Sequence, residues 1–201
     1  MWIFNLRSYL QVMVYPPLQA LDFDTPSMRA HGDAAFLSRD FINWFYNYYL
    51  FGNQRNFNKI RHNNHTPKHI KELLRTEYMQ MTDLPQDEIL RDYVLPPPSD
   101  GDHTFWSDHQ SKFLNPDISP LMAKPGTLAG LPHTFILSCN NDVLRDDAYY
   151  YEARLRREGV EVEHVCASSC YHGWWSAGAI RKVETFREHY QTLVKYVDKH
   201  L

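Results

Sequence analysis

A strand–helix–strand pattern in the C-terminal third of the chain constrains its fold more than any other feature. An apolar run at 133–139 precedes a helical pattern from Asp146 to Glu158, and a second apolar run follows at 160–166. Gly159 stands where helices commonly end, because glycine adopts the left-handed conformation at low cost. Two strands joined by one helix form a right-handed βαβ unit with parallel strands. We therefore predict an α/β fold built on a parallel sheet.

A third strand and a last helix extend this unit. Gln11–Tyr15 is an apolar-leaning run that stops at Pro16-Pro17, and we interpret it as a strand buried on both faces. A last helix is predicted for about 179–200, where apolar residues recur at helical spacing: Ile180, Val183, Phe186, Tyr190, Leu193, Val194 and Val197. The C-terminal third is then βαβα, the edge of a doubly wound sheet.

The segment between these strands has a different character. Ser38 precedes an aromatic helix, and Thr66 and Pro67 are predicted as the N-cap and first residue of another helix. We predict a first sheet strand in 1–17, a mainly helical lid inserted at 18–117, and the βαβα part at 118–201. Two interpretations of the aromatic helix stay open: it packs on its own domain, or it roofs a pocket for an acyl or aryl group. The aromatic residues concerned are Phe41, Trp44, Phe45, Tyr48 and Tyr49.

Composition excludes several classes of protein. Apolar residues make up 43% and charged residues 22% of the chain, as in ordinary folded domains. A net charge of −3 gives no reason to expect a nucleic-acid partner. The opening Met1–Arg7 is interrupted by polar residues too early to span a membrane or to serve as a signal peptide. We therefore expect no transmembrane segment in this chain.

The cysteines and clustered histidines do not form a metal pattern. Cys139, Cys166 and Cys170 cannot all pair with one another, and we expect Cys139 and Cys166 to be buried thiols. His62, His65 and His69 are interpreted as solvated surface residues, because the helix start at Thr66 breaks any common face. No metal and no cofactor are therefore predicted. Asn64 begins an Asn-His-Thr triplet that fits the glycosylation rule in a secretory compartment.

An acid and a histidine follow the two C-terminal strands. Asp142 comes just after the first of these strands, and His172 comes 30 positions later, after the second. Parallel strands bring such loops to one edge of a sheet, where a carboxylate can orient a catalytic histidine. We predict Asp142 as the acid and His172 as the base. Asp146 and Asp147 are alternative acids, and an Asp142 that only caps the next helix is the structural alternative.

No nucleophile accompanies this pair. The G-x-S-x-G elbow that exposes a catalytic serine occurs nowhere in the 201 residues. Cys170 is too close to His172 along the chain to be poised against its ring. The nearby serines lack flanking glycines: Ser138, Ser168, Ser169 and Ser176. We therefore predict no nucleophile in this chain.

Four segments resemble the hormone-sensitive-lipase group of α/β-hydrolases, which includes the arylacetamide deacetylases and neutral cholesterol ester hydrolases. The segments are Val14–Gln19, Asn115–Leu121, Asp142–Asp147 and Arg154–Val160, and their order and spacing agree with that group. The resemblance implies an α/β-hydrolase fold, with Asp142 as acid and His172 as base. It also implies hydrolysis of apolar carboxylic esters or aryl amides through an acyl-serine.

The resemblance further implies parts that this chain does not contain. Members of the group carry an H-G-G-G oxyanion loop and a G-D-S-A-G-G elbow upstream of the strand that begins here near Leu10, and an N-terminal anchor in the endoplasmic reticulum membrane with the catalytic domain in the lumen. Ser169-Cys170 before His172, and Trp174-Trp175 after it, depart from the usual pattern.

Three interpretations of the chain stay open. It is the C-terminal part of a carboxylesterase and is inactive alone, or it is a non-catalytic protein that binds an apolar ligand or a partner. In the second case the unpaired edge of the strand at 11–15 favours self-association. A shortened reading of a longer gene is the third.

Overall fold

Three parallel strands form the sheet in the order β1-β2-β3. The computed structural model describes residues 9–34, 36–91, 93–174 and 184–201. The strands are β1 (Leu10–Val14), β2 (His133–Asn141) and β3 (Val162–Tyr171), and Met13 pairs with Ile136, which pairs with His164. The predicted parallel sheet and its βαβ unit are confirmed.

The crossover helix α7 spans Arg145–Arg157, one residue earlier at each end than predicted. Asp146 and Asp147 stand in its first turn, where carboxylates interact favourably with the helix dipole. Gly159, with φ of 80°, turns the chain from the end of α7 toward β3. This is the role that the sequence predicts for it.

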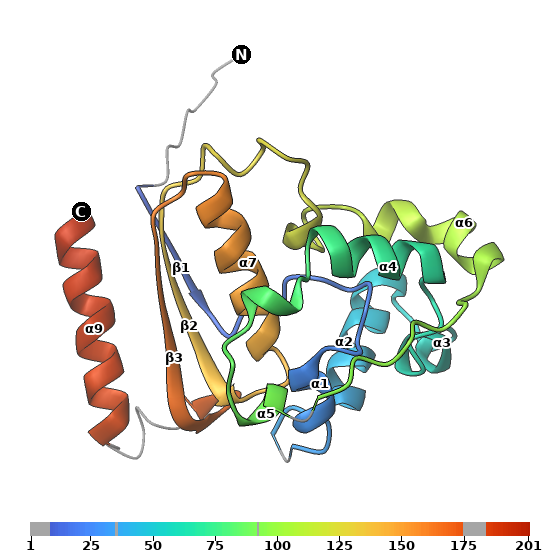
Figure 1. Cartoon of the computed structure of the whole chain (residues 1–201), viewed down its shortest axis with the longest axis horizontal. Coiled ribbons are helices and arrows are strands. Elements are labelled where there is room, and N and C mark those ends of the chain that lie inside the picture. The colour runs from blue at the N-terminus through green and yellow to red at the C-terminus, as the bar shows by residue number, and fades with distance from the viewer. Residues whose placement is uncertain (1–8, 35, 92, 175–183) are drawn as a thin grey trace.

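The two faces of the sheet are covered by different parts of the chain (Figure 1). Helix α7 lies on one face, with the helical segments between β1 and β2 beyond it, while α9 (Glu184–His200) lies on the opposite face. Side chains alternate along β2 accordingly: Ile136 packs in the larger core, whereas Phe135 and Leu137 pack toward α9 with Tyr196. The predicted start of the last helix, with Ile180 and Val183, falls outside the described residues.

The regular structure in the long connection between β1 and β2 is helical. Its described residues contain no strand. The helical elements are α1 (Pro26–Ala30), α2 (Arg39–Phe51), α3 (Phe57–Arg61), α4 (Lys68–Glu77), η1 (Met81–Asp83), α5 (Glu88–Arg91), α6 (His103–Phe113) and η2 (Pro120–Met122).

Helix α2 buries a different stripe from the aromatic one singled out in the sequence. Ser38 caps the helix as predicted, since its side chain accepts a hydrogen bond from the backbone N–H of Phe41. The core-facing residues are Ile42, Asn43, Tyr46, Asn47 and Leu50. The aromatic side chains Phe41, Phe45, Tyr48 and Tyr49 are exposed instead. Packing on its own domain therefore accounts for the buried side of α2 but not for its exposed aromatic side.

Two further expectations were wrong in detail. Val12 and Val14 of β1 are exposed, so this strand is not buried on both faces, because it lies at an edge of the described sheet. Helix α4 begins at Lys68 with Pro67 as its cap residue, so Thr66 is not the N-cap. None of the helices in the described parts is long and apolar enough to cross a membrane.

Candidate active site

Asp142 and His172 meet at the carboxyl edge of the sheet. Asp142 follows β2 and His172 follows β3, so the parallel pairing of these strands places both at one edge. The Nδ1 of His172 lies 2.8 Å from Oδ2 of Asp142. The Asp142 side chain is buried, whereas His172 is 27% exposed. Because the carboxylate accepts a hydrogen bond from Nδ1–H, Nε2 is the nitrogen that remains for proton transfer.

The second carboxylate oxygen of Asp142 is also engaged. Its Oδ1 accepts a hydrogen bond of 3.0 Å from the backbone N–H of Leu144, at the start of α7. Leu144 is the cap residue of α7, and this helix has no side-chain cap, so Asp142 forms a turn before the helix and does not cap it. One carboxylate oxygen is thus held by the backbone before α7, and the other faces the histidine.

The two alternative acids have other partners. Asp146 accepts a hydrogen bond from the backbone N–H of Ser27 at 2.7 Å and pairs with the buried Arg145. Asp147 accepts from the backbone N–H of Leu18 at 3.0 Å, and burial raises the pKa of its carboxyl to about 7. Both aspartates thus tie α7 to the segment that follows β1. Of the three candidates, only Asp142 contacts His172.

A cavity of about 450 Å³ opens beside the histidine. Its lining includes His172 and combines the two strand ends with the loop after α1: Ala30, His31, Asp33, Ala34, Phe36, Leu37, Asn141, Tyr171 and His172. His31, Asp33 and Tyr171 are titratable groups of this lining that no sequence pattern indicates. Burial, followed by the charge of Arg145, lowers the pKa of the His31 imidazole. No local motif marks these residues, because the loop after α1 and His172 lie far apart along the chain.

Aromatic contacts and a glycine surround the histidine. The ring centroids of Tyr15 and His172 lie 5.1 Å apart. Gly173 has a φ of 78°, and a Cβ atom there would lie 2.7 Å from Cε1 of Phe36. The positive φ favours glycine at this position, and an added Cβ would also require the exposed Phe36 side chain to shift. This position fixes how the chain leaves His172.

The cysteines differ from the sequence expectation. Cys139 and Cys170 form a disulfide with their Cα atoms 5.3 Å apart, so Cys139 is not a free thiol. Cys166 is free as expected, but it is half-buried and not fully buried. The bond joins the ends of β2 and β3 just before Asp142 and His172. The spacing of 31 residues hides this pairing in the sequence, and only the parallel register of the strands reveals it. Cys170 is therefore not available as a nucleophile.

Ser138 contacts a different histidine. Its Oγ lies 2.7 Å from Nε2 of His164, whose Nδ1 lies 2.7 Å from Oε2 of Glu152. This buried set imitates a catalytic triad, but Ser138 stands within β2, is only 2% exposed and is absent from the lining of the cavity beside His172. Ser168 is exposed on β3, Ser169 belongs to the same strand, and Ser176 lies outside the described residues.

The clustered histidines do not act together. His62 and His69 are exposed as expected, but His65 is fully buried, so the expectation of a solvated His65 was wrong. The His65 ring lies between Phe23 and Phe113, and Nε2 donates a hydrogen bond to the carbonyl of Ala20 at 2.9 Å. Burial lowers the pKa of this imidazole to about 4. Asn64, beside it, is exposed between α3 and α4.

Sequence comparison shows relatives over most of the chain. A family profile described as "alpha/beta hydrolase fold" matches residues 75–176, about half of the chain. Arylacetamide deacetylase from Bos taurus is 31% identical over 170 residues, which is 84% of this chain and 42% of that protein. Neutral cholesterol ester hydrolase 1 from Rattus norvegicus is 34% identical over 166 residues, 82% of this chain and 40% of that protein. The chain thus spans about two fifths of the length of these relatives.

Solved structures agree on the fold. An esterase from Pseudomonas putida superposes with a TM-score of 0.60 at 18% identity, covering 96% of this chain and 42% of that one. An esterase from Pyrobaculum calidifontis gives 0.55 at 19% identity, covering 94% and 42%. The resemblance noted in the sequence is confirmed: this chain belongs to the α/β-hydrolase fold family and is similar to the arylacetamide deacetylases and neutral cholesterol ester hydrolases.

Proposed function

We propose that the chain supplies the acid and the base of a serine carboxylic ester hydrolase. The observation that carries this proposal is the 2.8 Å contact between Asp142 and Nδ1 of His172 beside the cavity. In such an enzyme Nε2 of the histidine removes the proton of the serine hydroxyl as it attacks the carbonyl carbon. The imidazolium, stabilised by Asp142, then protonates the leaving alcohol or amine. Water, activated by the same histidine, releases the acid from the acyl-serine.

The substrate would be an apolar carboxylic ester or an aryl amide. The cavity beside His172 is bordered by Phe36, Leu37 and Tyr171. A second cavity of about 370 Å³ lies under the aromatic side of α2 and is lined by Pro17, Ile42, Phe45, Tyr46, Tyr49, Asp117, Ile118 and Pro120. Rings and aliphatic side chains at both places favour an apolar acyl or aryl group. Residues 18–117 would then act as the lid, with the catalytic parts in 1–17 and 118–201.

The serine and the oxyanion donors would come from residues other than those of this chain, since its sequence holds neither motif. We expect the isolated chain to be inactive, because both the nucleophile and the donors that stabilise the tetrahedral intermediate are needed. Labelling with a fluorophosphonate probe tests this expectation. The isolated chain should not react, and stoichiometric labelling of it would contradict the proposal.

A fused protein gives the positive test. The upstream part of bovine arylacetamide deacetylase that this chain does not cover is joined to residue 10. Fluorophosphonate labelling and hydrolysis of a p-nitrophenyl ester should then both appear, and His172→Ala should remove them. Substitution of the exposed His62 by alanine serves as the control and should leave both unchanged. Activity that survives His172→Ala would contradict the proposed base.

A secretory compartment fits two features. The Cys139–Cys170 disulfide is one feature, because disulfides persist in oxidising compartments such as the secretory pathway. Asn64 is exposed and would be open to glycosylation in the lumen of the endoplasmic reticulum. When the chain is directed to that lumen in cells, a peptide-N-glycosidase should shift its electrophoretic mobility, and Asn64→Gln should remove the shift. A mobility that the glycosidase does not change would contradict glycosylation of Asn64 in that compartment.

A non-catalytic role is the second candidate, and the exposed edge of the sheet favours it. Val12 is 42% and Val14 is 36% exposed on β1, whose one described neighbour is β2. Exposed apolar strands at an edge pair readily with another chain. Under this proposal the chain self-associates through residues 11–15. Light scattering should then show a dimer that Val12→Lys converts to a monomer, and a monomeric parent chain would contradict it.

A further inference from the structure

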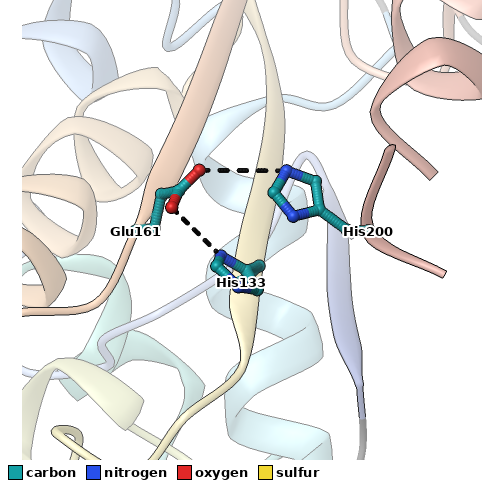
Figure 2. Close-up of side chains that lie close together, drawn as sticks. All are labelled: His133, Glu161 and His200. Carbon is teal, nitrogen blue, oxygen red and sulfur yellow. Dashed lines mark ion pairs between the residues drawn. The ribbon is translucent and has the colours of Figure 1, made fainter. Parts of the chain in front are cut away.

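A second cluster of side chains lies at the opposite edge of the sheet from His172. His133 is the first residue of β2, Glu161 immediately precedes β3, and His200 is the last residue of α9 (Figure 2). These positions are at the N-terminal ends of the strands, whereas Asp142 and His172 follow their C-terminal ends. The length of β2 therefore separates the two places by roughly 25 Å. Any role of this cluster is independent of the proposed hydrolase chemistry.

The three donor atoms converge on one point. Nδ1 of His133 lies 3.4 Å from Oε2 of Glu161, and Nε2 of His200 lies 3.8 Å from Oε1. The donor atoms of all three residues lie within 4.8 Å of one another. Ligands bound to a tetrahedral zinc ion at about 2.1 Å are about 3.4 Å apart. Small side-chain rotations would bring this set to that spacing.

A second observation, at His200, points to a ligand at this place. Its side chain is 8% exposed, and Nε2 is buried with no hydrogen-bond partner in the described parts of the chain. Its ring packs against those of His133 and Tyr196 in tilted arrangements, with centroids 4.4 Å and 4.5 Å apart, and Nε2 points toward Glu161. A buried polar atom without a partner costs stability. A bound cation at this point would satisfy it.

The neighbouring charges admit a cation. Lys199 competes for the site, since its Nζ lies 3.7 Å from Oε1 of Glu161. This side chain is 66% exposed and can turn away into solvent. A metal ion therefore has to displace one weak surface ion pair.

We propose that His133, Glu161 and His200 bind a divalent transition-metal ion, with zinc as the best match and water as its fourth ligand. Two imidazoles and one carboxylate suit zinc, whereas calcium and magnesium prefer oxygen ligands alone. The ion would connect the end of α9 to the starts of β2 and β3 and so stabilise the docking of this helix. No spacing rule reveals the set in the sequence, because its members come from three separate segments.

Zinc binding by the tag-free 201-residue chain tests the proposal after dialysis against a chelator. Titration calorimetry should show one zinc ion per chain and none of magnesium, and zinc should raise the unfolding temperature. His133→Gln and Glu161→Gln, both at exposed positions, should each weaken zinc binding by more than about tenfold and remove the thermal shift. Lys199→Gln should bind zinc at least as tightly as the parent chain.

The control is His103→Gln, which removes one histidine from the surface pair His69–His103, whose rings are 5.9 Å apart. It should leave zinc binding unchanged. His200→Gln is measured as well, and the exposed variants keep the test valid if it fails to fold. Equal zinc affinity in the parent, His133→Gln and Glu161→Gln chains would overturn the proposal, as would the absence of zinc binding by the parent.

Discussion

The disulfide between Cys139 and Cys170 should contribute a large part of the stability of the chain. It closes a loop with a sequence separation of 31 residues, from the end of β2 through α7 to β3. Closing a loop of that length removes unfolded-state entropy worth about 3–4 kcal/mol at room temperature. For a domain of this size each kcal/mol shifts the unfolding temperature by about 2–4 °C. Replacing both cysteines by alanine should therefore lower it by about 10 °C.

Two measurements separate the covalent bond from the packing of the side chains. Urea unfolding of the Cys139→Ala/Cys170→Ala chain gives the change in the free energy of unfolding, and adding a reductant to the parent chain gives the effect of the bond alone. Cys166→Ser is the matched control, since Cys166 is free and half-buried, and it should cost less than about 1 kcal/mol. If the oxidised and reduced parent chains unfold at the same urea concentration, this reasoning is refuted.

Three further predictions concern single residues. His65 has a pKa of about 4 in the folded chain against 6.5 when free, so the folded state binds the proton less readily. The stabilisation from this residue is complete above pH 6.5, and the free energy of unfolding falls by about 3 kcal/mol as the pH drops to 4. Urea unfolding should show that this pH-dependent loss disappears in His65→Gln. Gly173→Ala should cost about 1–2 kcal/mol of unfolding free energy because of its φ of 78°. Adding Phe36→Ala should restore only the part of this loss that comes from contact between the new Cβ and the Phe36 ring, and full restoration would contradict the conformational argument. Ser27→Ala removes the hydroxyl that donates to the carbonyl of Val143 at 2.8 Å and should cost about 1–3 kcal/mol in thermal unfolding, whereas the exposed Ser168→Ala should cost less than about 0.5 kcal/mol.

The parts of the fold that follow from local periodicity could be predicted. The strands at β2 and β3, α7 and Gly159 all follow from apolar runs and one glycine, and the parallel register then accounts for the meeting of Asp142 and His172. The contact of Asp142, and not Asp146 or Asp147, with His172 also follows from position, because only Asp142 lies just beyond the strand.

Features made by distant segments could not be predicted. The burial of His65 depends on contacts with Phe23 and Phe113. The aromatic side of α2 is exposed because the opposite side of the helix, with Ile42 and Tyr46, packs into the core. The disulfide, the cavity beside His172 and the cluster around Glu161 each join residues from different elements. Sequence spacing carries no signal for such contacts, since they are set by packing.

The most direct test of the proposed acid–base pair compares two carboxylates in the fused protein. Asp142→Asn should lower kcat for ester hydrolysis by about 10⁴-fold, because the histidine then loses its orienting carboxylate. Glu152→Gln removes the carboxylate of the buried Ser138–His164 set and should change kcat by less than about tenfold once the folded fraction is accounted for. A fused protein that keeps its kcat with Asp142→Asn, or loses it equally with Glu152→Gln, would contradict the assignment of Asp142 and His172.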